Sequence, residues 1–99
     1  MKNYMSNNTE NHKKELIEVI YKISRDKHLL GDFVKDILTP REFGIISARW
    51  QIVKRLEKGE RQRSIADSLH VGIATVTRGS VEMSKKDGGI RKTLKVIHK

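Results

Sequence analysis

The chain has 99 residues, a formal net charge of +9 and no cysteine. The lack of cysteine excludes disulfide bonds and thiolate metal sites, and the length favours one small domain. Aromatic residues make up 5% of the chain and charged residues 33%, which favours an all-α fold over a sheet. No apolar run has the length of a signal-peptide core or a membrane span, so we expect a soluble, cytoplasmic protein with no membrane partner.

The positive charge is concentrated toward the C-terminus. Residues 1–60 carry 12 Lys/Arg and 9 Asp/Glu, a net charge of +3, whereas residues 61–99 carry 9 and 3, a net charge of +6. Concentrated positive charge indicates a polyanionic partner such as nucleic acid. We therefore expect the C-terminal two-fifths of the chain to bind that partner.

The N-terminal half predicts a polar arm and two helices. Residues 1–9 are Asn-rich, which predicts a flexible arm ahead of a single helical domain over residues 10–99. A first helix is predicted from Glu10 to about Arg25, because apolar residues recur at helical spacing: Leu16, Val19, Ile20 and Ile23. A second, His28 to Leu38, has an apolar face that is too wide for a lone surface helix: Leu29, Leu30, Phe33, Val34, Ile37 and Leu38. We expect this face to pack against a second subunit.

The clearest local signal is a helix start at Pro40. Thr39 suits the N-cap position, and Glu42 is placed to close a capping box back to Thr39. This helix is expected to end at Gly59, because glycine adopts the left-handed C-terminal conformation without strain. Trp50, within it, is most simply a core or interface residue.

Two short helices follow, with the layout of a helix-turn-helix over about residues 62–83. The first is predicted over Gln62–Leu69 and the second over Gly72–Met83, and a last helix follows Gly88 and Gly89. Ile65, Leu69 and Val76 are expected to face inward, with Val71 filling the turn. His70 occupies a turn position where the backbone often has a positive φ.

The outer face of these two helices predicts contacts with DNA. Short side chains at the start of the second helix let its backbone enter the major groove, where hydroxyl and methyl groups contact phosphates and base edges. Gln62 and Arg63, at the start of the first helix, are expected to hold phosphates. The expected DNA-binding residues are Gln62, Arg63, Ala66, Ile73, Ala74, Thr75 and Thr77.

The sequence gives no sign of an enzyme. It contains no nucleophile-elbow, phosphate-loop, dinucleotide-binding or zinc-protease motif. The four histidines are scattered without the spacing of metal ligands, so no metal is expected: His12, His28, His70 and His98.

The segments LTPREFGIISARWQIVKRLEKGERQRSIADSL and GIATVTRGS resemble the tryptophan repressor family over about residues 36–84. The resemblance implies an intertwined all-helical homodimer that binds L-tryptophan as corepressor and then binds an operator of tryptophan-related genes. It also implies that Arg78 pairs with the ligand carboxylate, that the partner subunit's Arg49 stacks on the indole ring, and that Gly79 lets the ring lie against the second helix. The resemblance further implies that Thr39 adds a hydroxyl group to the site and that backbone carbonyls near Asp36 and Leu38 take the ligand ammonium group.

The sequence departs from the family pattern at three places. The linker before Gln62 is one residue shorter, Ala66 replaces a lysine that faces DNA, and Glu82 replaces a serine near the ligand ammonium group. Two alternatives remain open: a helix-turn-helix regulator with a different small effector or none, and a basic scaffold that binds nucleic acid without sequence preference.

Overall fold

The computed structural model describes residues 2–98, and these residues form six helices and no strand, as the expected all-α fold requires. The chain divides into two compact units, residues 1–43 and 44–99. A single helical domain over residues 10–99 stays a prediction for the assembled protein. No helix within residues 2–98 is both long and apolar enough to span a membrane.

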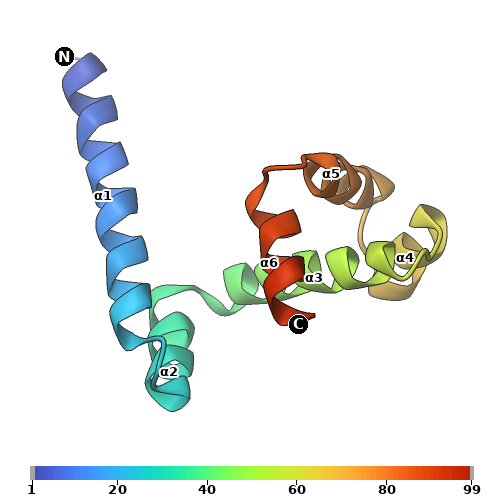
Figure 1. Ribbon diagram of the computed structural model, residues 1–99, viewed down its shortest axis with the longest axis horizontal. Coiled ribbons are helices and arrows are strands. Elements are labelled where there is room, and N and C mark those ends of the chain that lie inside the picture. Colours follow the sequence, from blue (N-terminus) through green and yellow to red (C-terminus); the bar gives the residue numbers. More distant parts are fainter. Residues whose placement is uncertain (1, 99) are drawn as a thin grey trace. The chain divides into compact units, whose positions relative to one another are not determined.

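The first unit is built on a pair of helices, α1 (Lys2–Ile23) and α2 (Lys27–Ile37), which pack against each other across a short turn (Figure 1). Asp26 caps α2, because its carboxylate accepts a hydrogen bond from the backbone N–H of Leu29 at 3.0 Å. α1 begins well before the expected start at Glu10, so residues 2–9 of the segment expected as a flexible arm are helical here. A polar segment continues a helix once the first turns have formed, and such a segment leaves no apolar pattern in the sequence.

Apolar side chains of the first unit remain largely in solvent. None of its described side chains is buried, and α2 has no buried residue at all. Large exposed apolar side chains occur on both helices and just beyond them: Leu16, Ile17, Val19, Tyr21, Leu29, Ile37 and Phe43. Large exposed apolar patches are rare on monomeric soluble proteins and mark surfaces that contact other molecules.

α3 (Pro40–Glu57) begins with the predicted capping box, which is confirmed. The backbone N–H of Glu42 donates to Thr39 Oγ1 at 3.1 Å, and the backbone N–H of Thr39 donates to Glu42 Oε1 at 2.8 Å. The N–H of Thr39 and, to a lesser extent, its side chain stabilise the charged carboxylate and lower the pKa of Glu42. The helix ends where predicted, with Gly59 at a φ of +87°.

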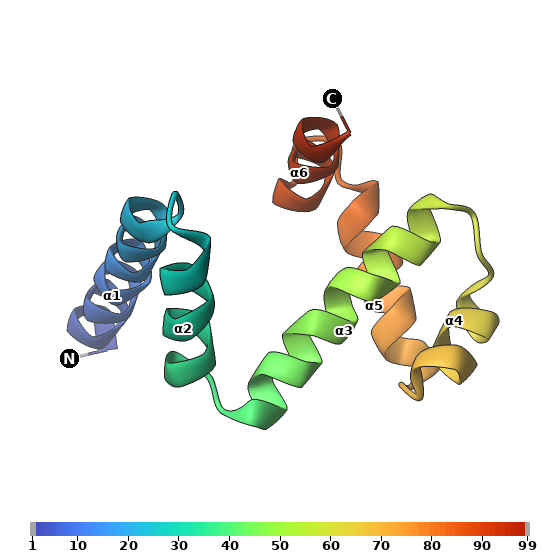
Figure 2. The same ribbon diagram turned by 90° about the horizontal axis from the view of Figure 1, so that it is seen from below.

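The second unit contains most of α3 together with α4 (Gln62–Leu69), α5 (Ile73–Ser84) and α6 (Gly89–Ile97). α5 crosses α3, and α4 lies beside α5 (Figure 2). One core cluster joins α3 to the helix-turn-helix through Ile52, Ile65, Ala66 and Val76, and the other joins α3, α5 and α6 through Val53, Met83 and Leu94. Trp50 packs against this second cluster, which agrees with a core role.

Arg91 fastens α6 to the end of α5. Its Nε and Nη2 atoms both donate to the backbone carbonyl of Met83, at 3.2 and 2.9 Å. A carbonyl in the last turn of a helix has no partner within that helix, so the guanidinium satisfies an acceptor that would otherwise need water. Together with Leu94, this contact fixes α6 against the helix that precedes it.

Candidate functional site

The helix-turn-helix predicted from the sequence is present as α4, a short turn and α5. His70 has φ 57° and ψ 44°, in the left-handed region, as predicted for this turn. The backbone N–H of Val71 donates to the carbonyl of Ala66 at 3.0 Å, and the side chain of Val71 packs against the core. Ile65 and Val76, both 0% exposed, lock the two helices together from the inside.

The outer face of the two helices is open to solvent. Arg63 on α4 is exposed, as are the first residues of α5. Ile73 is 48% exposed although it is a large apolar residue. An exposed face that combines a cation, hydroxyl groups and short apolar groups has the composition that proteins use to contact DNA in the major groove.

Ala66 does not belong to this outer face, so its assignment to DNA binding is corrected. Its side chain is 6% exposed and packs in the core with Ile52, Ile65 and Val76. The small methyl group lets α4 approach the rest of the core, but it leaves nothing to reach a nucleic acid.

Thr77 and Gln62 are connected to each other. Thr77 Oγ1 donates to Gln62 Oε1 at 2.7 Å and also lies 3.0 Å from the carbonyl oxygen of Ile73. The contact joins the first residue of α4 to the middle of α5. It orients the amide of Gln62 so that its NH2 group keeps its donors for another acceptor, which a phosphate oxygen can supply.

Sequence reasoning missed the part played by Arg55. Its Nη1 atom donates to Ser68 Oγ at 2.7 Å and lies 4.0 Å from Glu60 Oε1. The side chain thereby connects the end of α3 to α4 and to the short linker between them. No sequence signal identifies this contact, because Arg55 and Ser68 are 13 residues apart and neither belongs to a motif.

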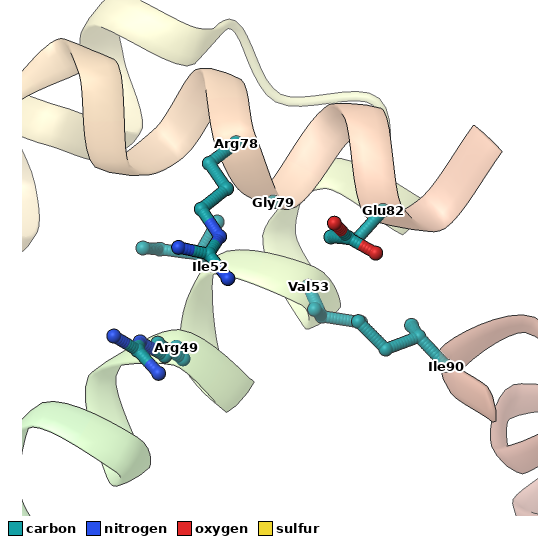
Figure 3. Close-up of a pocket in the computed structure, with 7 residues that line it drawn as sticks. All are labelled: Arg49, Ile52, Val53, Arg78, Gly79, Glu82 and Ile90. Atoms are coloured by element: carbon teal, nitrogen blue, oxygen red, sulfur yellow. The ribbon is translucent and has the colours of Figure 1, made fainter. Parts of the chain in front are cut away.

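A hollow of about 280 Å³ lies between α3, α5 and α6. Its volume is just below the range of about 300–1,000 Å³ that is usual for small-molecule sites. Arg78 extends from α5 toward α3, on which Arg49 lies, and Glu82 follows one turn later on α5 (Figure 3). The remaining lining residues are Ile52, Val53, Gly79 and Ile90.

Gly79 is required by the close crossing of α5 over α3. A Cβ atom at this position would lie 2.9 Å from Ile52 Cγ2 and 3.7 Å from Leu56 Cδ1. Real Cβ atoms essentially never come within 3.0 Å of a heavy atom outside their own stretch of chain. The absence of a side chain therefore serves helix packing, in addition to the role toward a ligand ring that the resemblance implies.

The charged groups of the hollow combine two cations with one anion. Arg49 and Arg78 are exposed guanidinium groups, and Glu82 is half-buried. Lys85 Nζ lies 2.9 Å from Glu82 Oε2. A hydrogen bond from Lys85 and the charge of Lys85, followed by the charge of Arg78, lower the pKa of Glu82 and keep it ionised.

Four of the predicted ligand-binding residues come together in this hollow: Arg49, Arg78, Gly79 and Glu82. Arg49 and Arg78 of the same chain line one hollow, and the expectation that a partner subunit supplies the arginine that stacks on the ring stays a prediction. The sequence analysis missed Ile52, Val53 and Ile90 as lining residues. Ile52 and Val53 follow Arg49 by three and four residues, so the helical period could have placed them on the same face as Arg49.

The other three predicted ligand residues belong to the first unit. Asp36 and Thr39 are exposed and Leu38 is half-buried. The hydroxyl of Thr39 accepts a hydrogen bond from the N–H of Glu42, which leaves its own proton available to a further acceptor. The roles of these three residues toward a ligand stay predictions.

Comparison with known proteins gives the family of the chain. Residues 11–97 match the family described as Trp repressor protein. The chain is 44% identical over 62 residues to the Trp operon repressor homolog of Vibrio parahaemolyticus, which covers 62% of this chain and 60% of that protein. It is 49% identical over 51 residues to that of Vibrio vulnificus, which covers 50% of each. The chain thus spans about three fifths or less of the length of these relatives. No solved structure matches the chain significantly.

Proposed function

The chain belongs to the Trp repressor protein family, and from this premise we propose that it is a DNA-binding transcriptional repressor with L-tryptophan as its corepressor. Its targets are operators of genes for tryptophan biosynthesis or uptake, and it acts in the cytoplasm, where those operators are. The relatives are named Trp operon repressor homologs, which is consistent with a repressor rather than an enzyme.

The observation that carries the proposal is that one helix lines the hollow and also exposes its first residues to solvent. α5 presents Arg78 and Glu82 to the hollow, while Ala74 and Thr75 at its start are exposed. A ligand in the hollow therefore contacts the helix that reads DNA. This direct connection gives the ligand a physical means to change the affinity for DNA.

The hollow has groups suited to each part of L-tryptophan. The guanidinium of Arg78 forms a bidentate pair with the carboxylate, and that of Arg49 stacks on the indole ring, two interactions that lysine does not provide as well. The apolar part of the ring is covered by Ile52, Val53 and Ile90. Backbone carbonyls near Asp36 and Leu38 and the hydroxyl of Thr39 complete the site in the proposed assembly.

The proposed mechanism is a shift between conformations of the helix-turn-helix. L-Tryptophan binds best when α5 holds the position relative to α3 that DNA also requires, so it selects that conformation. Ligand and operator then strengthen each other's binding by the same factor. On DNA, Gln62 and Arg63 hold phosphates, while Ile73, Ala74 and Thr75 lie in the groove. Thr77 acts mainly by holding the amide of Gln62.

The repressor is proposed to be a homodimer. The exposed apolar surface of the first unit needs a cover, and a second copy of the same surface supplies one. A dimer also presents two helix-turn-helix segments at the spacing of one DNA turn, as palindromic operators require.

The test is Arg78→Ala, compared with the matched control Arg63→Ala. Calorimetric titration of L-tryptophan without DNA is expected to show about tenfold weaker binding or worse in Arg78→Ala, because a charge-assisted bidentate pair is lost. Arg63 does not line the hollow, so Arg63→Ala is expected to keep the wild-type affinity for tryptophan and to weaken DNA binding.

The outcomes separate the alternatives. Wild-type affinity for tryptophan in Arg78→Ala overturns the ligand site. If a panel of amino acids and indoles binds and tryptophan does not, the effector is a different one. If genomic DNA fragments bind equally with and without tryptophan and without sequence preference, the chain is a basic nucleic-acid scaffold.

A further inference from the structure

The ion pair between Glu82 and Lys85 lies at the edge of the ligand hollow. Glu82 Oε2 and Lys85 Nζ are 2.9 Å apart, and the two side chains are 39% and 59% exposed. Glu82 lines the hollow, whereas Lys85 does not. The pair therefore places a negative charge inside the hollow and a positive charge just outside it.

The charges inside the hollow have an order along α5. Arg78 and Glu82 are four residues apart, on the same face of the helix, and Arg49 lies across from them on α3 (Figure 3). A ligand with a single negative charge pairs with the arginines but brings that charge near the carboxylate of Glu82. A ligand that carries both a carboxylate and an ammonium group pairs with the arginines through the first and with Glu82 through the second.

We propose that Glu82 makes the hollow selective for indole ligands that carry an ammonium group, and that Lys85 is the internal cation that such a ligand displaces. This inference rests on the proposed function, because it assumes that the hollow binds indole compounds. It adds the specificity determinant and assigns a role to Lys85.

The exchange of cations explains the selectivity. Without a ligand, Lys85 neutralises Glu82 and keeps it ionised, as the lowered pKa of Glu82 reflects. The ammonium group of a bound ligand pairs with the Glu82 carboxylate in place of Lys85. The long, largely exposed side chain of Lys85 then returns to water at little cost. A carboxylate ligand without an amine gains nothing from Glu82 and is repelled by it.

The experiment measures the affinities of two ligands that differ in one group. L-Tryptophan has the α-amine, and indole-3-propionate is the same molecule with hydrogen in its place. Both are titrated calorimetrically, without DNA, into the wild type, Glu82→Gln, Lys85→Met and the control Asp87→Asn. Asp87 is exposed in the turn before α6, outside the hollow, and its substitution changes the net charge by the same amount as Glu82→Gln.

The wild type is expected to prefer tryptophan, and Glu82→Gln is expected to lose about tenfold in tryptophan affinity without losing affinity for indole-3-propionate. Retained binding of indole-3-propionate also shows that this variant is folded. Lys85→Met is expected to bind tryptophan about two- to fivefold more tightly and indole-3-propionate more weakly. Asp87→Asn is expected to keep the wild-type preference.

Three results overturn the inference while leaving the proposed function in place. The first is equal wild-type affinity for the two ligands, the second an unchanged preference in Glu82→Gln, and the third weaker tryptophan binding in Lys85→Met. Failure of the wild type to bind either ligand would instead overturn the proposed function and the inference with it.

Discussion

The two compact units of the chain solve the problem of burying apolar surface in different ways. The second unit has its own core, in which Ile65 and Val76 are completely buried, and it contains the hollow between α3, α5 and α6. The first unit has apolar residues at similar density but no buried described side chain. The difference indicates that the second unit is shaped mainly by contacts within the chain, while the first is shaped for contact with another surface.

The largest effect is expected from a charge placed on the exposed apolar surface of the first unit. Ile37 is 55% exposed, so Ile37→Asp would cost little if this surface were solvated. If a second copy covers it, the buried and unpaired carboxylate destabilises the assembled protein by about 3–5 kcal/mol. Sedimentation at micromolar concentration, together with thermal unfolding, is expected to show a dissociated and less stable chain.

Lys35→Asp is the control for this experiment. It introduces the same residue on the same helix but on the side away from the apolar face, and Lys35 is exposed. A wild type that sediments as a monomer, or equal effects of the two variants, would remove the distinction between the units.

A smaller effect, opposite in sign between the units, is expected from replacing a helical glycine by alanine. Gly79→Ala forces a Cβ atom against Ile52 and is expected to cost about 1–2 kcal/mol, even after the gain in helix propensity. Gly31 on α2 has nothing within 4 Å of an added Cβ, so Gly31→Ala is expected to stabilise by up to about 1 kcal/mol. Chemical denaturation measures both changes.

Adding Ile52→Leu to Gly79→Ala sharpens this comparison. Leucine lacks the branch at Cβ that carries Cγ2, so it removes the atom that the new methyl group would meet. The double variant is expected to recover part of the lost stability. Equal losses with and without Ile52→Leu would show that the strain arises elsewhere.

The smallest effect is expected at the start of α3, the helix that contains residues of both units. Thr39→Ala removes the N-cap hydroxyl and is expected to cost about 1 kcal/mol. The pKa of Glu42 is lowered from its ordinary value of 4.5, chiefly by the backbone N–H of Thr39. The contribution of ionised Glu42 is therefore complete above that ordinary value and is lost as the pH falls through the lowered pKa of the folded chain.

Glu42→Gln tests this pH dependence. The variant is expected to be less stable than the wild type at neutral pH and to match it once the pH is below the lowered pKa, because the wild-type carboxyl is then also uncharged. Thermal unfolding over an acid pH series measures the difference. A stability difference that stays constant with pH would contradict a role for the charge of Glu42.

The features that could be predicted from the sequence depend on residues close together in the chain. The capping box of Thr39 and Glu42 and the end of α3 at Gly59 are set by hydrogen bonds and backbone geometry within a few residues. The positive φ of His70 has the same local origin. That Arg78 and Glu82 share a face follows from the helical period alone.

Tertiary structure decided the features that depend on how the helices pack. Ala66 is a core residue rather than a DNA contact, because α4 packs with its Ala66 side toward α3. Arg49 lines the hollow beside Arg78 of the same chain, because α5 packs against α3. The bond between Arg55 and Ser68 joins residues 13 positions apart. Helical periodicity tells which residues share a face of one helix, but it contains no information on which face of another helix they meet. That choice is made by the fit of side chains such as Ile52 against Gly79, which exists only once the chain is folded.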